Sequence, residues 1–245
     1  MASKNPFYIC NPAMRQWAAI PKLRGYNVAA LYHHSSSGEY RILCWKGCLS
    51  DAHYYVLTVG SSLEPRYIGR FVASDRPPIL LHNCLHWHLN VGPIRGLLVF
   101  DTIVESLKCI RPPATHNWCY AAVLEMDGLL GVSCTRHDYT MVDLWVLQDY
   151  KTEMWSMKYQ LELPVAELTS IGKSDKFTAS IVSDYGDMLV VVGGDMHLFY
   201  CDSKGKLLQH FRWDHVFPRP TDGTLWNNNF TTVHHFVSVE LGSSL

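Results

Sequence analysis

A strand-turn-strand pattern recurs along this chain and limits the folds it can adopt. Its clearest copy is residues 97–113, LLVFDTIVESLKCIRPP, in which an acidic turn residue separates two strands and prolines close the second. The first strands of the copies begin at residues 7, 54, 97, 144 and 197, so the steps are 47, 43, 47 and 53 residues. A period in the forties, with strands in each unit, is typical of a β-propeller. The sequence therefore predicts an all-β, propeller-like fold.

A further hairpin precedes each copy except the first. In three units its two strands are apolar and flank a tight turn. These turns are His82-Asn83, Asp127-Gly128 and Tyr185-Gly186. Asn, Asp and Gly reach the positive φ angles that a two-residue hairpin turn requires. We therefore expect about five blades of four antiparallel strands, folded as a single domain over residues 1–245.

The first unit is shorter than the others, because only six residues precede Phe7. A propeller must join its ends to remove open sheet edges, usually by pairing a terminal strand into the first blade. Residues 231–241, TTVHHFVSVEL, have the pattern of one more strand. We expect an incomplete first blade that residues 232–239 close.

The charge balance argues against two classes of partner. The net charge of −1 provides no attraction to a phosphate backbone or to anionic lipid. We expect neither nucleic acid nor a membrane as partner.

The first residues, MASKNPFYIC, have no signal-peptide pattern, which favours a location in the cytoplasm or the nucleus. The eight cysteines lack the dense spacing of a disulfide scaffold and are interpreted as mostly free thiols.

Two groups of cysteine and histidine residues have the chemistry of metal ligands. Cys84, His86 and His88 alternate, so a strand would point all three to one face. Structural zinc sites instead take pairs of ligands from two separate segments, which favours a structural role. The same reasoning applies to a second group, Cys44, Cys48 and His53. We expect no metal and no cofactor.

The sequence contains no common catalytic motif. It has no Gly-x-Ser-x-Gly elbow, no His-Glu-x-x-His and no Gly-x-x-x-x-Gly-Lys loop. A Ser-His-Asp arrangement assembled in space is left open by a single sequence. We expect no enzymatic activity.

Loops at one end of the predicted blades carry candidate contact residues. Loops on a rigid scaffold concentrate recognition residues, and exposed Trp, Tyr and Arg anchor protein interfaces. The candidates for partner binding are Trp118, Arg136, His137, Tyr139 and Trp226. The alternative interpretation is that these aromatic residues cover blade edges.

Several short motifs occur in a fixed order along the chain. They are Cys10-Asn11-Pro12, YVLTVG at 55–60, LHW at 85–87, LVFD at 98–101, LWVL at 144–147 and FVS at 236–238. Together, over about residues 7–241, they resemble the F-box-associated interaction domain of plants. The resemblance implies the substrate-receptor part of an SCF-type ubiquitin ligase, whose F-box docks through an adaptor subunit and directs ubiquitin-dependent degradation.

No F-box precedes Phe7, so adaptor binding is expected only if an F-box exists outside this chain. The resemblance still implies a protein-interaction module that recognises a protein target. Two alternatives are a structural remnant without a partner and a small propeller enzyme or ligand-binding protein with an axial site. An axial site needs polar residues on inner strands. The inner-strand candidates are apolar: Leu80, Leu81, Val123, Leu124, Ile181 and Val182.

Overall fold

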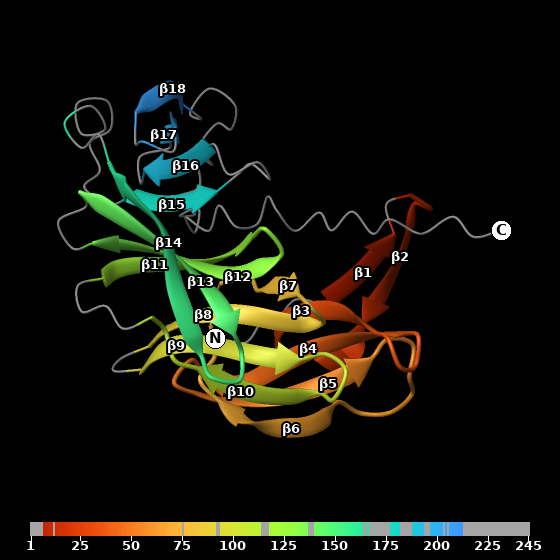
Figure 1. Cartoon of the computed structure of the whole chain (residues 1–245). Coiled ribbons are helices and arrows are strands. Elements are labelled where there is room, and N and C mark those ends of the chain that lie inside the picture. Colours follow the sequence, from red (N-terminus) through yellow and green to blue (C-terminus); the bar gives the residue numbers. More distant parts are fainter. Residues whose placement is uncertain are drawn as a thin grey trace.

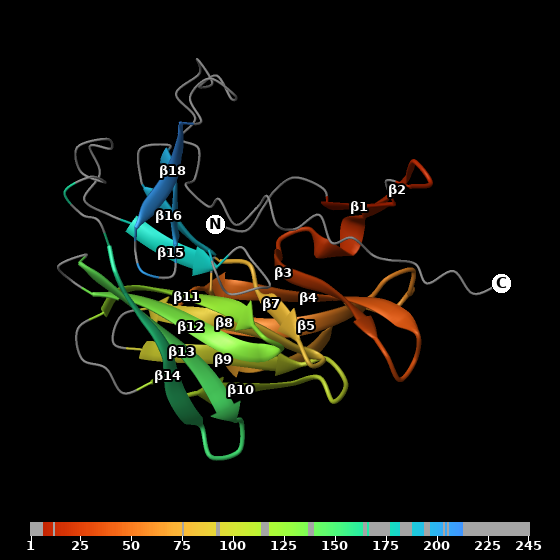
Figure 2. The same ribbon diagram turned by 45° about the horizontal axis from the view of Figure 1, so that its top comes forward.

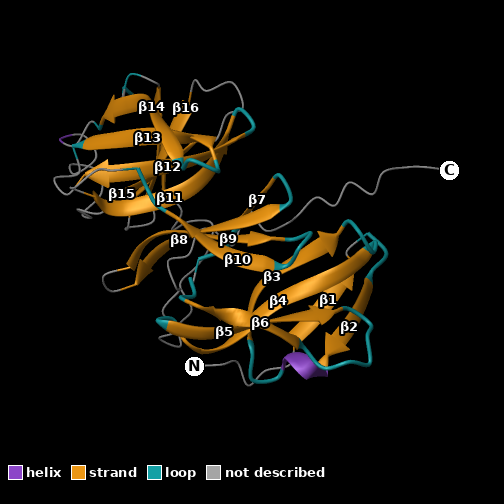
Figure 3. Cartoon of the chain, turned by 60° about the horizontal axis from the view of Figure 1, so that its bottom comes forward, coloured by secondary structure: helices purple, strands orange, loops and turns teal. Residues whose placement is uncertain are grey.

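The computed structural model confirms an all-β architecture (Figure 3). The structure describes residues 7–11, 13–74, 76–91, 94–113, 118–136, 140–163, 166, 177–181, 188–193, 197–202, 204 and 206–212. Strands account for most of these residues, and a short 3-10 turn, η1 (Pro21–Leu23), lies beside the first hairpin. Within these residues no helix is long and apolar enough to cross a membrane.

The described strands form one two-stranded sheet and four four-stranded antiparallel sheets. Blade 1 is β1 (Phe7–Asn11) and β2 (Gln16–Ile20). Blade 2 is β3 (Asn27–His34), β4 (Glu39–Cys48), β5 (Asp51–Thr58) and β6 (Arg66–Phe71). Blade 3 is β7 (Ile79–Leu81), β8 (Cys84–Val91), β9 (Ile94–Asp101) and β10 (Ser106–Ile110). Blade 4 is β11 (Trp118–Met126), β12 (Leu129–Arg136), β13 (Met141–Asp149) and β14 (Met154–Glu162). Blade 5 is β15 (Phe177–Ile181), β16 (Met188–Gly193), β17 (His197–Asp202) and β18 (Leu207–Arg212).

Each sheet pairs its strands in chain order, and the sheets follow one another along the sequence (Figures 1 and 2). We call the successive strands of a four-stranded blade a, b, c and d. This arrangement confirms about five blades, and among the described residues the first blade has two strands. The closing residues 232–239 and the turn at Tyr185-Gly186 lie outside the described residues, so both remain predictions.

Consecutive blades bury apolar side chains between them, because the middle strands pack on both faces. On β4, Ile42 and Cys44 face blade 1, whereas Leu43 and Trp45 face blade 3. On β9, residues 97–100 are fully buried and alternate between the cores shared with blades 2 and 4. A strand buried on both faces reads as a continuous apolar run, as these segments do. The stacking of blades therefore produces the core.

The a–b hairpin turns have the backbone that the sequence predicts. His82 and Asn83 have φ angles of 50° and 59°, and Asp127 and Gly128 have φ angles of 53° and 72°. Two consecutive positive φ angles are the mark of a type I′ turn, which matches the twist of the flanking strands. Both turns are thus confirmed.

The c–d turns of blades 3 and 4 share one local structure. The Asp101 carboxylate accepts hydrogen bonds from the backbone N–H groups of residues 103 and 104, and Asp149 accepts one from residue 151. Four residues later, Glu105 and Glu153 have φ angles of 54° and 55°. An Asp side chain that caps its own turn favours this geometry. The fifth residue of each turn is thereby held in the left-handed region.

Blade 1 repeats this turn with different side chains. The Asn11 side-chain oxygen accepts the backbone N–H of Met14 at 3.2 Å. Arg15, the fifth residue, has a φ angle of 52°. The match identifies β1 and β2 as the c and d strands of their blade.

Candidate recognition surfaces

Trp118 and Arg136 occupy the open end of the β11–β12 hairpin. Their Cα atoms are register partners, and a bulge follows Trp118. Bulges often re-aim side chains at functional sites. The structure thus brings together two of the five predicted partner-binding residues. The side chain of Trp118 lies outside the described residues, as do His137, Tyr139 and Trp226 entirely, so all five assignments remain predictions.

A buried carboxylate holds the Arg136 side chain. The guanidinium lies 3.4 Å from both carboxylate oxygens of Asp143, whose side chain is 7% exposed, while Arg136 is 39% exposed. Gln160 on the next strand donates to the same carboxylate at 2.9 Å. These contacts order Arg136 before any partner arrives, which lowers the entropic cost of binding through it.

A second ordered arginine lies at the same end of blade 2. Arg70 binds the Asp51 carboxylate through two nitrogens, one at 2.8 Å, and its side chain is 64% exposed. The Asp51 carboxylate raises the pKa of Arg70. Asp51 begins strand c of blade 2, just as Met141 does in blade 4, so strand direction places both arginines at the b–c end of their blades. Arg70 was not among the predicted contact residues, because only the strand register brings it beside Asp51.

The β4–β5 turn at this end depends on glycine. Gly47 has a φ angle of 108°, and a side chain there would collide with the carbonyl oxygen of Asp51. Cys48 follows it and is exposed. A hydrogen bond with the Ser50 hydroxyl lowers the pKa of the Cys48 thiol. The tight turn therefore presents a polar loop next to the Asp51–Arg70 pair.

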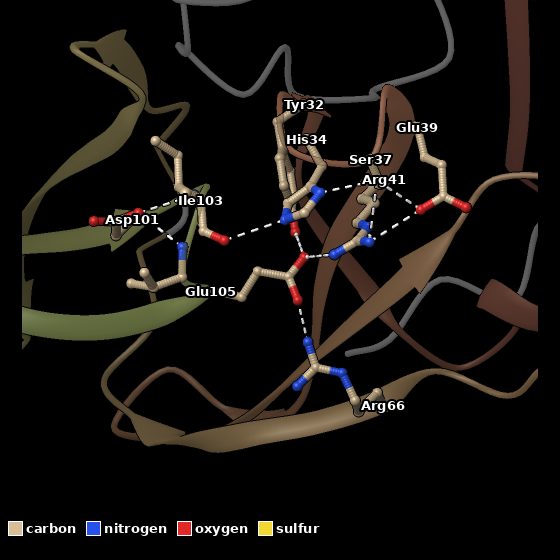
Figure 4. Close-up of polar contacts among 10 residues, drawn as sticks. Tyr32, His34, Ser37, Glu39, Arg41, Arg66, Asp101, Ile103 and Glu105 are labelled. Atoms are coloured by element: carbon tan, nitrogen blue, oxygen red, sulfur yellow. Dashed lines mark hydrogen bonds and ion pairs between the residues drawn. The ribbon is translucent and has the colours of Figure 1, made fainter.

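At the opposite end, a buried carboxylate joins blades 2 and 3 (Figure 4). Glu105 accepts hydrogen bonds from the Tyr32 hydroxyl at 2.7 Å and the Arg41 guanidinium at 2.5 Å, and it also pairs with Arg66. The Glu105 side chain is 6% exposed, compared with 17% for Arg41 and 60% for Arg66. A buried charge is tolerated only when it is paired and hydrogen-bonded, as it is here.

The ionisation of this cluster follows from burial and pairing. Burial alone would raise the pKa of Glu105, but the bonds from Arg41 and Tyr32 outweigh it and place that pKa below its usual range. Burial, together with the bond to Glu105, raises the pKa of Tyr32. Glu105 is thus a carboxylate and Tyr32 a neutral donor at neutral pH.

Neighbouring side chains extend the cluster along the β3–β4 turn. His34 bonds the Ser37 hydroxyl at 2.9 Å and the backbone oxygen of Ile103 at 3.1 Å. Arg41 also donates to the Glu39 carboxylate at 3.0 Å. Two turns from different blades are therefore tied together at one place.

A small pocket opens beside this cluster. It has a volume of about 150 Å³. Its lining includes Arg41, Arg66, Thr58 and Leu63. The positive and negative side chains of the lining balance, because Glu105 and Glu64 accompany the two arginines. The pocket is much smaller than the roughly 300–1,000 Å³ of small-molecule sites.

Two of the suggested metal ligands, His86 and Cys44, have other roles in the structure. His86 is fully buried and bonds the Ile79 carbonyl at 3.3 Å and the Tyr150 hydroxyl of blade 4 at 2.9 Å. Burial lowers the pKa of His86 to about 4. Cys44 is buried between blades 1 and 2, whereas Cys48 is exposed. Across the described part of the chain, no three His, Cys, Asp or Glu residues gather as metal ligands would.

Comparison with known proteins identifies the family. Residues 1–237 match the sequence profile described as "F-box associated beta propeller domain". The chain belongs to this family. F-box protein At4g19940 of Arabidopsis thaliana is 22% identical, over 79% of this chain and 54% of the relative. F-box protein At1g47340 of the same plant is 28% identical, over 81% of this chain and 42% of the relative.

The F-box associated propeller spans about half the length of these curated relatives. A solved structure of a functionally unknown protein from Desulfotomaculum acetoxidans is also similar. It has a TM-score of 0.45 and 10% identity, over 77% of this chain and 57% of that one. The family match agrees with the propeller that the sheet order describes.

Proposed function

We propose that this F-box associated propeller recognises a protein target through the b–c end of its blades. The two arginines that carboxylates hold there, Arg70 and Arg136, support the proposal most directly. Arginine is enriched at energetic hot spots, and a carboxylate that fixes its guanidinium reduces the entropy lost on binding. Trp118, opposite Arg136 in the sheet, adds an aromatic residue at the same end.

In a longer protein that carries an F-box, this module would deliver its target to an SCF-type ubiquitin ligase in the cytoplasm or nucleus. The relatives support this role, because they are F-box proteins about twice as long as the matched part. The propeller would select the target, and the F-box would contact the adaptor subunit. The chain would then act as a binding module without chemistry of its own.

Affinity capture with matched variants tests target recognition. The triple variant carries Trp118→Ala, Arg70→Ala and Arg136→Ala, and Arg66→Ala is the control. Arg66 is likewise an exposed arginine paired with a carboxylate, but it begins strand d of blade 2 and so lies at the opposite, c–d end. Purified parent and variants are incubated with plant extract, and retained proteins are identified by mass spectrometry.

A protein retained by the parent and by Arg66→Ala, but lost from a folded triple variant, is the expected result. Circular dichroism and thermal unfolding establish that the variants keep the β fold. Equal capture by all three proteins would refute recognition through the b–c end. Reconstitution of the captured protein with a full-length F-box relative then tests whether it is ubiquitinated.

A further inference from the structure

One face of blade 2 carries a row of basic side chains at the b–c end. Lys46, His53 and Arg70 are successive register partners on β4, β5 and β6. Directly opposed residues of neighbouring antiparallel strands point to the same face of a sheet. Neighbouring strands lie about 4.8 Å apart, so the row spans roughly 10 Å. We call these three residues the basic row.

Tyrosine rings border the basic row on the same face. The Tyr67 ring lies 6.1 Å from the His53 ring and 5.5 Å from the Tyr55 ring, measured between centroids. Tyr55 in turn meets Tyr26 edge to face at 5.3 Å. Tyr26 is buried in the core next to blade 1, whereas Tyr67 is 52% exposed. The rings therefore lead from the core to the surface beside the basic row.

Lys46 is held on this face by an aromatic ring. Its ammonium lies 3.9 Å from the centroid of the Tyr26 ring, and the residue is exposed. A ring attracts a cation through its quadrupole but carries no opposite charge. Among the residues that the structure describes, Lys46 forms no ion pair. Its positive charge is therefore ordered but not neutralised.

The other groups on this face also leave hydrogen-bond donors open. Asp51 accepts from Nε and Nη2 of Arg70, and Nη1 has no acceptor among the described residues. Within the same part of the chain, the hydroxyl groups of Tyr55 and Tyr67 make no hydrogen bond. Lys46 and Arg70 together carry one more charge than Asp51 balances. The face therefore fits a ligand that supplies negatively charged acceptors.

We propose that the basic row, with Tyr55 and Tyr67, binds an acidic segment of the target protein. Carboxylates accept charge-assisted hydrogen bonds from ammonium and guanidinium groups, and such bonds are about twice as strong as neutral ones. In an extended segment, alternate side chains point to one side about 7 Å apart, so two carboxylates fit within the row. This inference rests on the proposed function, because it names the chemistry of the target at the b–c end.

Selection from a random peptide library tests the chemistry of the segment. Peptides displayed on phage are selected on the purified parent chain, after binders to an unrelated protein are removed. Lys46→Glu is selected in parallel, with Lys151→Glu as the matched control. Lys151 is likewise an exposed lysine without an ion pair to the described residues, but it lies in the c–d turn of blade 4. Circular dichroism establishes that both variants keep the β fold.

We expect the parent and Lys151→Glu to enrich peptides that contain Asp and Glu, and Lys46→Glu to lose this enrichment. Fluorescence anisotropy then measures the affinity of the most enriched acidic peptide. Lys46→Gln and Arg70→Gln should each weaken binding roughly tenfold, because each removes a charged hydrogen-bond donor. Lys151→Gln should bind like the parent, and salt should weaken binding to the parent.

Three results would overturn the acidic site. They are enrichment of neutral or basic peptides, no enrichment on the parent, and an acidic peptide that binds Lys46→Gln as tightly as the parent. Failure of the proposed function is detected separately, by equal capture of proteins from extract by the parent and the triple variant. A target lost from the triple variant but fully retained by Lys46→Gln would support recognition through the b–c end and overturn the acidic site.

Discussion

The ion pairs that Glu105 and Glu153 form with the preceding blade start from the same turn structure but differ in their surroundings. Both glutamates lie four residues after a capping aspartate and have nearly equal φ angles of 54° and 55°. Glu105 is 6% exposed and joins two arginines, whereas Glu153 is 22% exposed and joins Arg111, which is 85% exposed. The same local structure therefore supports a buried ion cluster in one interface and a surface pair in the next.

This contrast shows that the neighbouring blade determines how much a turn residue contributes to the free energy of unfolding. Removing one partner of a buried pair leaves an uncompensated charge, which costs about 3–5 kcal/mol. Exposed pairs contribute only about 0–1 kcal/mol, because water and salt screen them. Variants at the two glutamates test whether burial alone accounts for the difference between the two ion pairs.

The largest effect is expected for Glu105→Gln. The neutral amide leaves the half-buried Arg41 with only the more exposed Glu39 carboxylate as counter-charge, so the free energy of unfolding should fall by about 3 kcal/mol. Urea unfolding of the parent and variant measures this change. Equal losses for Glu105→Gln and Glu153→Gln would contradict the role given to burial.

The pH dependence of stability should also distinguish the two interfaces, because His86 lies between blades 3 and 4. Its folded pKa of about 4 lies below the ordinary value of 6.5, because burial disfavours the charged ring. The unfolded chain therefore binds the proton first, and stability should fall by about 2–3 kcal/mol as pH drops from 6.5 to 4. Unfolding measured across this range should lose that slope in His86→Asn.

Glu105 should respond only in more acid solution. Its folded pKa lies below the ordinary 4.5, so its contribution is complete above that pH and is lost as pH falls through the folded pKa. If the Glu105→Gln variant lost as much stability below pH 4.5 as the parent does, groups other than Glu105 would be responsible for the loss.

Glycine at the two turn positions should have effects of opposite sign. A positive φ angle costs a non-glycine residue roughly 1–2 kcal/mol, which glycine avoids. Glu153→Gly should therefore leave stability unchanged or raise it by about 0.5–1 kcal/mol. Glu105→Gly should lower it by about 2 kcal/mol, because the lost ion cluster outweighs the relaxed backbone. Melting temperatures compare the two, and a shared sign would refute the contrast.

The smallest effect is expected for Glu153→Gln, which should cost about 0.5 kcal/mol. The cost should vanish at about 1 M salt, where the Debye length is about 3 Å. Chemical unfolding at low and high salt provides the measurement. A loss above 2 kcal/mol, or one insensitive to salt, would show that the Arg111–Glu153 pair acts as a buried one.

Local patterns predicted much of the fold correctly. The apolar run at residues 97–100 indicated a strand, and it proved to be buried on both faces. His82-Asn83 and Asp127-Gly128 predicted the turns that the structure contains. Each of these features depends on a few consecutive residues.

The candidate sites were harder to predict, because their partners are distant in the sequence. Arg136 was recognised as a contact residue, but its buried partner Asp143 and the Asp51–Arg70 pair were not. His34 is 8% exposed and bonds the Ile103 backbone, 69 residues away in the sequence. No pattern of neighbouring residues predicts a contact between residues so far apart in the sequence.

The sequence by itself determined the strands, their turns and the repetition of blades, because alternation and turn chemistry act over a few residues. The tertiary structure decided which of the repeated side chains contribute most to stability. Glu105 and Glu153 follow Asp101 and Asp149 at the same spacing, yet one meets Arg41, 64 residues away, in a site where the Glu105 side chain is only 6% exposed. The physical reason is that water weakens the attraction between two charges. Packing between blades determines how much water remains around each pair.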